Sequence, residues 1–169
     1  VYNVYNTDAA WGAQWNLSQL WTLAYPEYMS EYISSHLQAY KDAGWLADGL
    51  ANNRYVSGVG TNLLSTIIAG AYECGIRGFD TKTAYEACLK NELDGKNRPF
   101  GAGKVNTAEF VKYGYVPHQD EGEGYHETFM FSASHTLEYS YSAWAVAQWV
   151  GQLGDTCLLY TSPSPRDGL

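Results

Sequence analysis

Basic residues are scarce in this chain of 169 residues. Ten Lys and Arg stand against 18 Asp and Glu, which gives a formal net charge of −8. The few basic residues form no stripe, so the sequence predicts neither a nucleic-acid nor a membrane-surface partner. It also has no run of 18 apolar residues, the length that a membrane-spanning helix needs.

The short motifs of several enzyme classes are missing as well. We find no GxSxG, no Walker loop, no GxGxxG and no HExxH. Gly101–Lys104 (GAGK) is too short for a phosphate-binding loop and follows no predicted strand. Cys74 and Cys88 lie at no metal-ligand spacing and are predicted to be buried thiols.

Aromatic residues, in contrast, are abundant, with 15 Tyr, 6 Trp and 5 Phe in a chain that is 46% apolar. This composition and length are typical of one globular domain. Most such rings pack in a core. Tyr and Trp in polar loops also suit stacking on sugar rings, so the loops are the places to look for a carbohydrate site.

Neutral and charged helical segments alternate along the chain. The neutral segments are Ala9–Ala24, Thr61–Cys74 and Ser134–Leu153, and the charged ones are Pro26–Ala43 and Thr81–Leu93. A short helix is predicted between Asn106, with Glu109 in a capping-box position, and Gly114. Pro26, Gly44, Gly75 and Asp80 supply start and stop signals for the other segments.

This alternation predicts two layers, with neutral helices buried on all sides and charged helices wet on one face. The order inner, outer, inner, outer, inner is expected of an α/α toroid, and an ordinary helical bundle is the alternative. Long polar-aromatic loops, Val1–Asp8, Gly44–Gly60 and Tyr115–Ala133, lead into the neutral helices. If these helices run parallel, the three loops meet at one end, where function is expected.

The stretch Phe131–Leu153 is apolar nearly all round, and Glu138 is its one charged residue. Ser132 or Ser134 is expected to cap the helix, Gly154 to follow its end, and Glu138 to lie in or near the first turn. There a carboxylate either caps the helix or forms the floor of a site.

Acids and histidines gather in the loop that precedes this helix. Asp120, Glu121, Glu123 and Glu127 offer oxygen ligands for Ca²⁺, but they lack EF-hand spacing, and a solvated acidic loop is the alternative. His118, His126 and His135 fall in the same region without zinc spacing. We interpret His135 as a hydrogen-bonded structural residue rather than a base.

Three segments, in order, resemble glycoside hydrolase family 92, the calcium-dependent inverting exo-α-mannosidases. They are AYECGIRGFDTKTAYEACLKNEL, VKYGYVP followed by an acidic loop, and SHTLEYSYSAWAVAQ, which is similar to a family pattern SKTLEYAYDDWCIAQ. The resemblance covers nearly all of Asn6–Gly154. It implies an all-α fold, a partial (α/α)6 toroid truncated at its C-terminal side.

The resemblance also implies a function. The parent protein would hydrolyse α-mannosides of glycans with Ca²⁺, and a periplasmic or extracellular location is expected. The acid, the base and most calcium ligands would lie beyond this chain, so the fragment, residues 1–156, is expected to be inactive alone. Residues 157–169 resemble a translated sequencing adapter and are predicted to be a non-native tail on a metagenomic fragment.

Sugar contacts are predicted for seven residues: Trp11, Trp45, Asp48, Asn53, Arg54, His135 and Glu138. The chain departs from the family where Gly12-Ala13 replaces Asp-Thr, where Ser142-Ala143 replaces Asp-Asp, and where Arg54 stands for an acid. A non-catalytic carbohydrate-binding relative and a helical protein-binding scaffold are the alternatives. The incomplete toroid is expected to expose apolar flanks and to associate when expressed alone.

Overall fold

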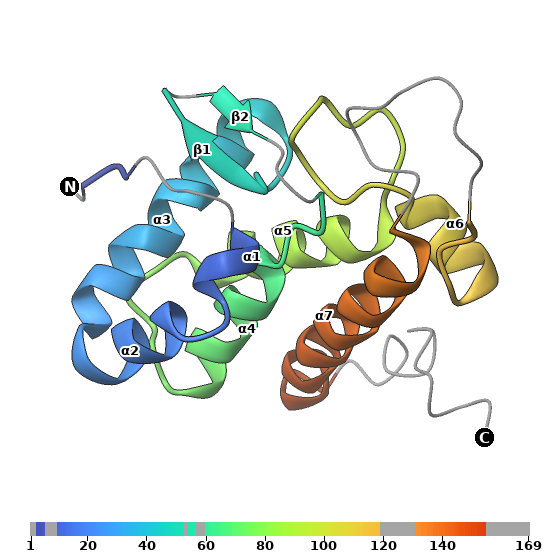
Figure 1. The fold of residues 1–169 in the computed structure, drawn as a ribbon. Coiled ribbons are helices and arrows are strands. Elements are labelled where there is room, and N and C mark those ends of the chain that lie inside the picture. Colours follow the sequence, from blue (N-terminus) through green and yellow to red (C-terminus); the bar gives the residue numbers. More distant parts are fainter. Residues whose placement is uncertain (1–2, 6–9, 53, 57–59, 119–130, 155–169) are drawn as a thin grey trace.

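The computed structural model describes residues 3–5, 10–52, 54–56, 60–118 and 131–154, which form seven helices and one short hairpin (Figure 1). The mostly helical fold predicted from the sequence is confirmed. The elements are α1 (Ala10–Ala13), α2 (Leu17–Ala24), α3 (Pro26–Ala43), β1 (Gly49–Ala51), β2 (Arg54–Val56), α4 (Leu64–Glu73), α5 (Thr81–Leu93), α6 (Thr107–Tyr113) and α7 (Ser132–Gln152).

Several helix ends lie where the sequence signals put them. Pro26 begins α3, and Gly44 ends it in the left-handed region with φ of 80°. The side chain of Asp80 caps α5 by accepting a hydrogen bond from the Thr83 amide at 3.1 Å. These ends were predictable because each depends on one residue type with a specific local effect.

Other ends differ from the prediction. Ala9–Ala24 is not one helix, because a turn at residues 14–16 separates α1 from α2. Gly12 weakens the helix on one side of this turn, and Asn16, a residue that competes with helical hydrogen bonding, takes the N-cap position of α2 on the other. The Gly44–Gly60 segment is also not only loop, since β1 and β2 pair antiparallel with Gly49 opposite Val56.

Helices α6 and α7 start without the expected side-chain caps. Phe131, not a serine, holds the N-cap position of α7, and Ser134 instead donates to the Phe131 carbonyl. Glu138 therefore lies in the second turn of α7. Asn106 makes no capping bond and is left-handed, with φ of 57°.

The helices form two layers. The neutral helices α1–α2, α4 and α7 lie side by side with α4 in the middle, and α3 and α5 pack behind them (Figure 1). The largest core side chain, Trp149, stacks on Tyr72 with a centroid distance of 4.6 Å. Helices α4 and α7 run parallel. Near their N-terminal ends, the Tyr139 hydroxyl of α7 donates to the Gly60 carbonyl, which precedes α4, and at their C-terminal ends Gln152 donates to Glu73.

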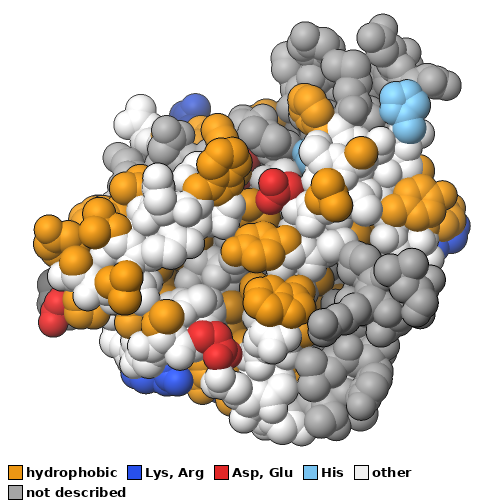
Figure 2. All heavy atoms as spheres, turned by 60° about the horizontal axis from the view of Figure 1, so that its bottom comes forward, with side chains coloured by type: hydrophobic (Ala, Val, Ile, Leu, Met, Phe, Trp, Pro, Cys, Tyr) orange, Lys and Arg blue, Asp and Glu red, His pale blue; other side chains and the backbone are white. Residues whose placement is uncertain are grey.

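The neutral helices are not buried on all sides as predicted. Helix α4 buries seven of its ten residues. Helices α2 and α7 instead expose large apolar side chains, among them Leu23 (83%), Leu137 (71%) and Trp144 (53%). Figure 2 shows hydrophobic side chains over much of the face that comes forward. No described element packs against these faces of α2 and α7, so their apolar side chains remain exposed.

The two cysteines differ in exposure. Cys88 is buried as predicted, but Cys74 is exposed because it follows the last turn of α4. No helix in the described part of the chain is long and apolar enough to cross a membrane.

Candidate functional site

Asp48 connects three separate segments at one end of the neutral helices. Its carboxylate accepts hydrogen bonds from the backbone amides of Asn62 (3.1 Å) and Gly60 (3.4 Å). Its own amide donates to the Gly101 carbonyl, and its carbonyl accepts from the Ala10 amide at 2.7 Å. Only 1% of Asp48 is exposed. It therefore holds the starts of α1 and α4 together from inside the fold.

Asn62 extends this connection to the next loop. Its side-chain amide donates to the backbone carbonyls of Leu46 and Gly103, each at 3.0 Å. The backbone carbonyl of Asn62 accepts from the Asn91 side chain on α5. Asn62 adopts φ of 42°, a left-handed conformation that asparagine tolerates better than most residues. The loops before α4 and before α6 are thereby fixed to each other.

The GAGK stretch, which we rejected as a phosphate loop, is a tight turn against Trp45. Gly103 has φ of 61°, and a Cβ there would lie 2.9 Å from the Trp45 ring. Trp45 is itself only 6% exposed, and the Lys90 ammonium lies 4.2 Å from its ring centroid. The turn directs Lys104 into the interior, where 1% of that residue is exposed.

Lys104 forms an ion pair that the sequence analysis missed. Its ammonium lies 2.5 Å from the Glu92 carboxylate on α5, and the second Glu92 oxygen accepts from Ser142 on α7 at 2.8 Å. Next to it, the Tyr139 hydroxyl donates to the Val105 carbonyl at 2.6 Å. Its one local signal is the pair of glycines before Lys104, because the two members are brought together by the packing of α5 and α7 against the loop between α5 and α6.

His135 and Glu138 lie on α7 beside this cluster. His135 is fully buried, and its ring stacks on Tyr139 with a centroid distance of 5.5 Å and an interplanar angle of 23°. Glu138 is half-buried. Burial raises the pKa of the Glu138 carboxyl, and the Lys104 charge opposes that rise. We call the region formed by Asp48, Asn62, Lys104, Glu138 and Tyr139 the mouth.

The remaining predicted site residues lie on α1 and β2 or outside the described structure. Trp11, in α1, is 38% exposed and packs edge-on against Trp15 at 6.1 Å. Arg54 is exposed in β2. Asn53 falls outside the described residues, as do the acidic loop within residues 119–130 and the predicted tail. A role in sugar binding stays a prediction for all seven residues.

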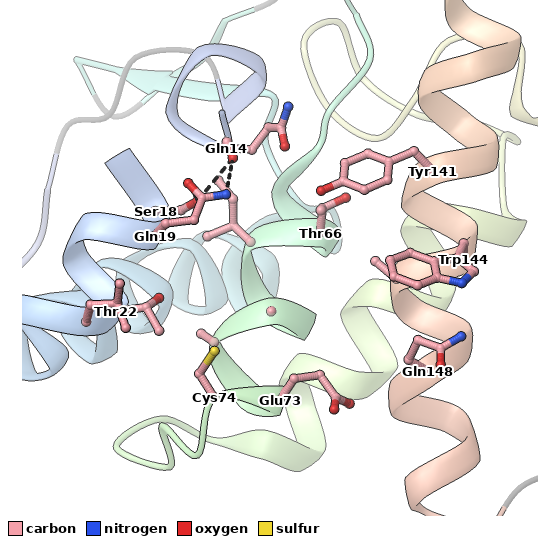
Figure 3. Close-up of a pocket in the computed structure, with 15 residues that line it drawn as sticks. Gln14, Ser18, Gln19, Thr22, Thr66, Glu73, Cys74, Tyr141, Trp144 and Gln148 are labelled. Atoms are coloured by element: carbon pink, nitrogen blue, oxygen red, sulfur yellow. Dashed lines mark hydrogen bonds between the residues drawn. The ribbon is translucent and has the colours of Figure 1, made fainter. Parts of the chain in front are cut away.

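A groove of about 370 Å³ lies between the three neutral helices (Figure 3). Tyr141 and Trp144 form one wall from α7, with parallel rings 6.4 Å apart. Gln14 and Ser18 lie on the opposite wall, and Thr66 is on α4. Most of the groove surface is contributed by carbon atoms, and Glu73, at the far end of α4, is its one acidic residue.

The described residues offer no evident metal centre. No group of three or more His, Cys, Asp or Glu side chains within them is placed to hold an ion. Asp48 and Glu92 already have their carboxylates engaged inside the fold. These donor sets therefore do not fit Ca²⁺, which takes six to eight oxygen ligands.

Comparison with known proteins places the chain in a family. The model of the glycosyl hydrolase family 92 catalytic domain matches residues 1–162. The chain belongs to this family. The family resemblance seen in the sequence is thus confirmed. No curated protein sequence gives a significant match.

Solved family 92 structures share the fold of this chain. An inverting mannosidase from Bacteroides thetaiotaomicron superposes with a TM-score of 0.78 at 24% identity over 94% of this chain. An α-mannosidase from the same organism, solved in complex with mannoimidazole, gives 0.77 at 22% identity over 95% of this chain. The chain spans about a fifth of the length of these relatives, 20% and 19%.

Proposed function

We propose that this chain is the N-terminal part of a family 92 catalytic domain whose parent protein hydrolyses α-mannosides of glycans with inversion. The match of residues 1–162 to the family 92 model carries this proposal. The parallel neutral helices, backed by α3 and α5, support its extension to part of an (α/α)6 toroid. A periplasmic or extracellular location of the parent belongs to the same proposal.

The mouth is the proposed sugar site. Three features support it: the beginnings of α1 and α4 meet there, α7 contributes Glu138, and exposed Trp11 and Arg54 lie on adjoining elements. A half-buried carboxylate accepts hydrogen bonds from hydroxyl groups, and an exposed indole can stack on a pyranose ring. Glu138 is proposed to position the sugar rather than to transfer a proton.

Hydrolysis itself is proposed to need residues outside this chain. Inversion uses two carboxyls roughly 6.5–9.5 Å apart, one as acid and one as base. At the mouth, the buried carboxylates of Asp48 and Glu92 are hydrogen-bonded inside the fold, Asp48 to backbone amides and Glu92 to Lys104 and Ser142, so neither is proposed as the acid or the base. The Ca²⁺ of the parent is likewise proposed to be bound by residues elsewhere.

The test is a titration of the purified chain with mannoimidazole and with methyl α-mannoside, followed by NMR. We expect saturable binding that Glu138→Gln weakens about tenfold, the usual cost of one charge-assisted hydrogen bond. Glu86→Gln, at an exposed position on α5, is the matched control and should bind like the unaltered chain. Mannosidase turnover by this chain would refute the proposal that hydrolysis needs residues outside it.

A second candidate is a non-catalytic carbohydrate-binding relative. Ser142-Ala143 and Gly12, which stand where the family pattern has acids, favour it. The coding sequence downstream of Asp155 decides between the two, because a binding relative should lack the acid and base carboxylates there. A helical scaffold that binds protein is the third reading, and it predicts no saccharide affinity at all.

A further inference from the structure

The groove between α1–α2, α4 and α7 has the size of a small-molecule site. Its volume of about 370 Å³ lies within the range of roughly 300–1,000 Å³ that ligand pockets occupy. Among the described residues that line it, none is basic and Glu73 is the one acid, which Gln152 engages at the far end of α4. The groove is therefore suited to a neutral and mostly apolar molecule.

Tyr141 and Trp144 give one wall of the groove two aromatic faces. They are one turn apart on α7, and their ring planes differ by only 17°. The two side chains are 41% and 53% exposed, so both rings are accessible to a ligand. Stacking of aromatic rings stabilises a contact beyond the apolar area that it buries. A flat aromatic ligand thus fits this wall better than an aliphatic ligand of the same size.

Thr66, on the α4 side of the groove, has a hydroxyl that finds no hydrogen-bond partner among the described residues, although 8% of the residue is exposed. A helical Ser or Thr often donates to the carbonyl four residues earlier, as Ser140 donates to Thr136 at 2.7 Å. For Thr66 that carbonyl belongs to Asn62, and it accepts from Asn91 instead. A buried hydroxyl without a partner is unfavourable, so a ligand that bonds to it gains affinity.

These features lie on facing elements of one groove. Figure 3 shows Thr66 on α4 between Gln14, on one wall, and Tyr141, on the other. A ligand that satisfies both sides needs a flat ring for the α7 wall and a hydrogen-bonding group for Thr66. A sugar fits less well, because most of its hydroxyls would face carbon atoms.

We propose that the groove is a binding site for a small, neutral aromatic molecule that carries a hydroxyl group. Its ring stacks on Trp144 or Tyr141, and its hydroxyl forms a hydrogen bond with Thr66. Phenol is the simplest molecule with both groups. The site is separate from the mouth, and the inference does not depend on the proposed sugar binding.

The first experiment is a titration of the 169-residue chain with phenol, followed by NMR at low protein concentration. We expect saturable shifts of the Trp144 indole N–H and of Thr66. Cyclohexanol, which keeps the hydroxyl but is not flat, should bind about threefold or more weakly. Trp144→Leu should weaken phenol binding by a similar factor. Tyr113→Leu, which removes an exposed ring on α6, is the matched control and should leave it unchanged.

The second experiment separates the hydrogen bond from the stacking. Thr66→Val keeps the shape of the side chain and removes a hydroxyl that has no partner in the fold, so the variant should remain folded. We expect it to bind phenol about fivefold more weakly, the usual contribution of one neutral hydrogen bond. Toluene, which has the ring without the hydroxyl, should bind the variant and the unaltered chain equally.

Three results would overturn the proposal. The first is the absence of saturable shifts in the groove, which is also what a groove filled by another segment or a second copy would give. Equal phenol affinities for Trp144→Leu and Tyr113→Leu would exclude stacking on the α7 wall. An unchanged phenol affinity in Thr66→Val would exclude the hydrogen bond.

Discussion

Asp48→Ala is the substitution that most directly tests how the mouth is built. Asp48 is 1% exposed and accepts hydrogen bonds from the amides of Gly60 and Asn62. Truncation to alanine leaves both amides inside the protein without this acceptor. The loss should appear as reduced stability of the fold, because the carboxylate attaches the segment before β1 to the segment that precedes α4. The backbone bond from Ala10 to the Asp48 carbonyl is kept in this variant.

The expected magnitude follows from the two contacts. Hydrogen bonds to a charged group contribute about 1.5–3 kcal/mol each, and the 3.4 Å bond to Gly60 counts for less than the 3.1 Å bond to Asn62. We expect a loss of about 2–4 kcal/mol in the free energy of unfolding. In a chain of this size that corresponds to a fall of roughly 4–16 °C in Tm.

Thermal unfolding followed by circular dichroism measures this effect. Asp48→Asn keeps one acceptor oxygen and should fall between the alanine variant and the unaltered chain. Asp42→Ala is the control, because Asp42 is an exposed residue of α3 that accepts only a surface hydrogen bond from Gln38. Equal melting temperatures for Asp48→Ala and Asp42→Ala would refute the connecting role of Asp48.

Three further predictions concern the flanks, the core and acid stability. Leu23 and Leu137 are 83% and 71% exposed, so Leu23→Lys combined with Leu137→Lys should reduce self-association in sedimentation velocity. Leu93→Lys on α5 is the control and should not reduce it. An unaltered chain that stays monomeric at every concentration would contradict this prediction. Trp149→Ala should lower the free energy of unfolding in urea by about 3–5 kcal/mol, because the indole is 1% exposed between Tyr72 and Tyr85, and a loss below about 1 kcal/mol would show that the site is not packed as described. Burial lowers the pKa of His36 from 6.5 to about 3, so the neutral buried imidazole stabilises the fold fully above pH 6.5, and this stabilisation is lost as the pH falls toward 3. In urea titrations, His36→Leu should therefore lose less stability between pH 7 and pH 4 than the unaltered chain. Equal losses would contradict the lowered pKa of His36.

The sequence predicted those parts of the fold that depend on a single residue's local preference. Pro26, Gly44 and Asp80 mark helix ends in the structure as they do in the sequence. The break between α1 and α2 was not predicted, because the apolar pattern continues across it. That pattern is a stronger helix signal than the helix-weakening effect of Gly12 and Asn16. Exposure of Leu23 and Leu137 likewise depends on what packs beside α2 and α7, which their own sequences do not contain.

The long loops before the neutral helices predicted that Asp48 and Glu138 lie at the same end of these helices, and they do, since Asp48 and Tyr139 both bond to Gly60. How that end is built was not predicted. Neither the hydrogen bonds from backbone amides to Asp48 nor the Lys104–Glu92 pair could be predicted from the sequence. Both depend on contacts between segments that lie 12 or more residues apart. The glycines before Lys104 were the one sequence signal for the position of Lys104, because glycines are typical of a tight turn as well as of a phosphate-binding loop.

We place the proposed sugar site at the mouth rather than in the groove because the two regions differ in polarity. Glu138 is a half-buried carboxylate near the beginning of α7, close to the buried Lys104–Glu92 pair. The groove beyond them presents mainly carbon atoms, including the rings of Tyr141 and Trp144. Such a surface gains most from burial against another apolar surface, whereas a sugar gains most from acceptors and donors held in place. The same three helices therefore present a polar end suited to a carbohydrate and an apolar side suited to packing.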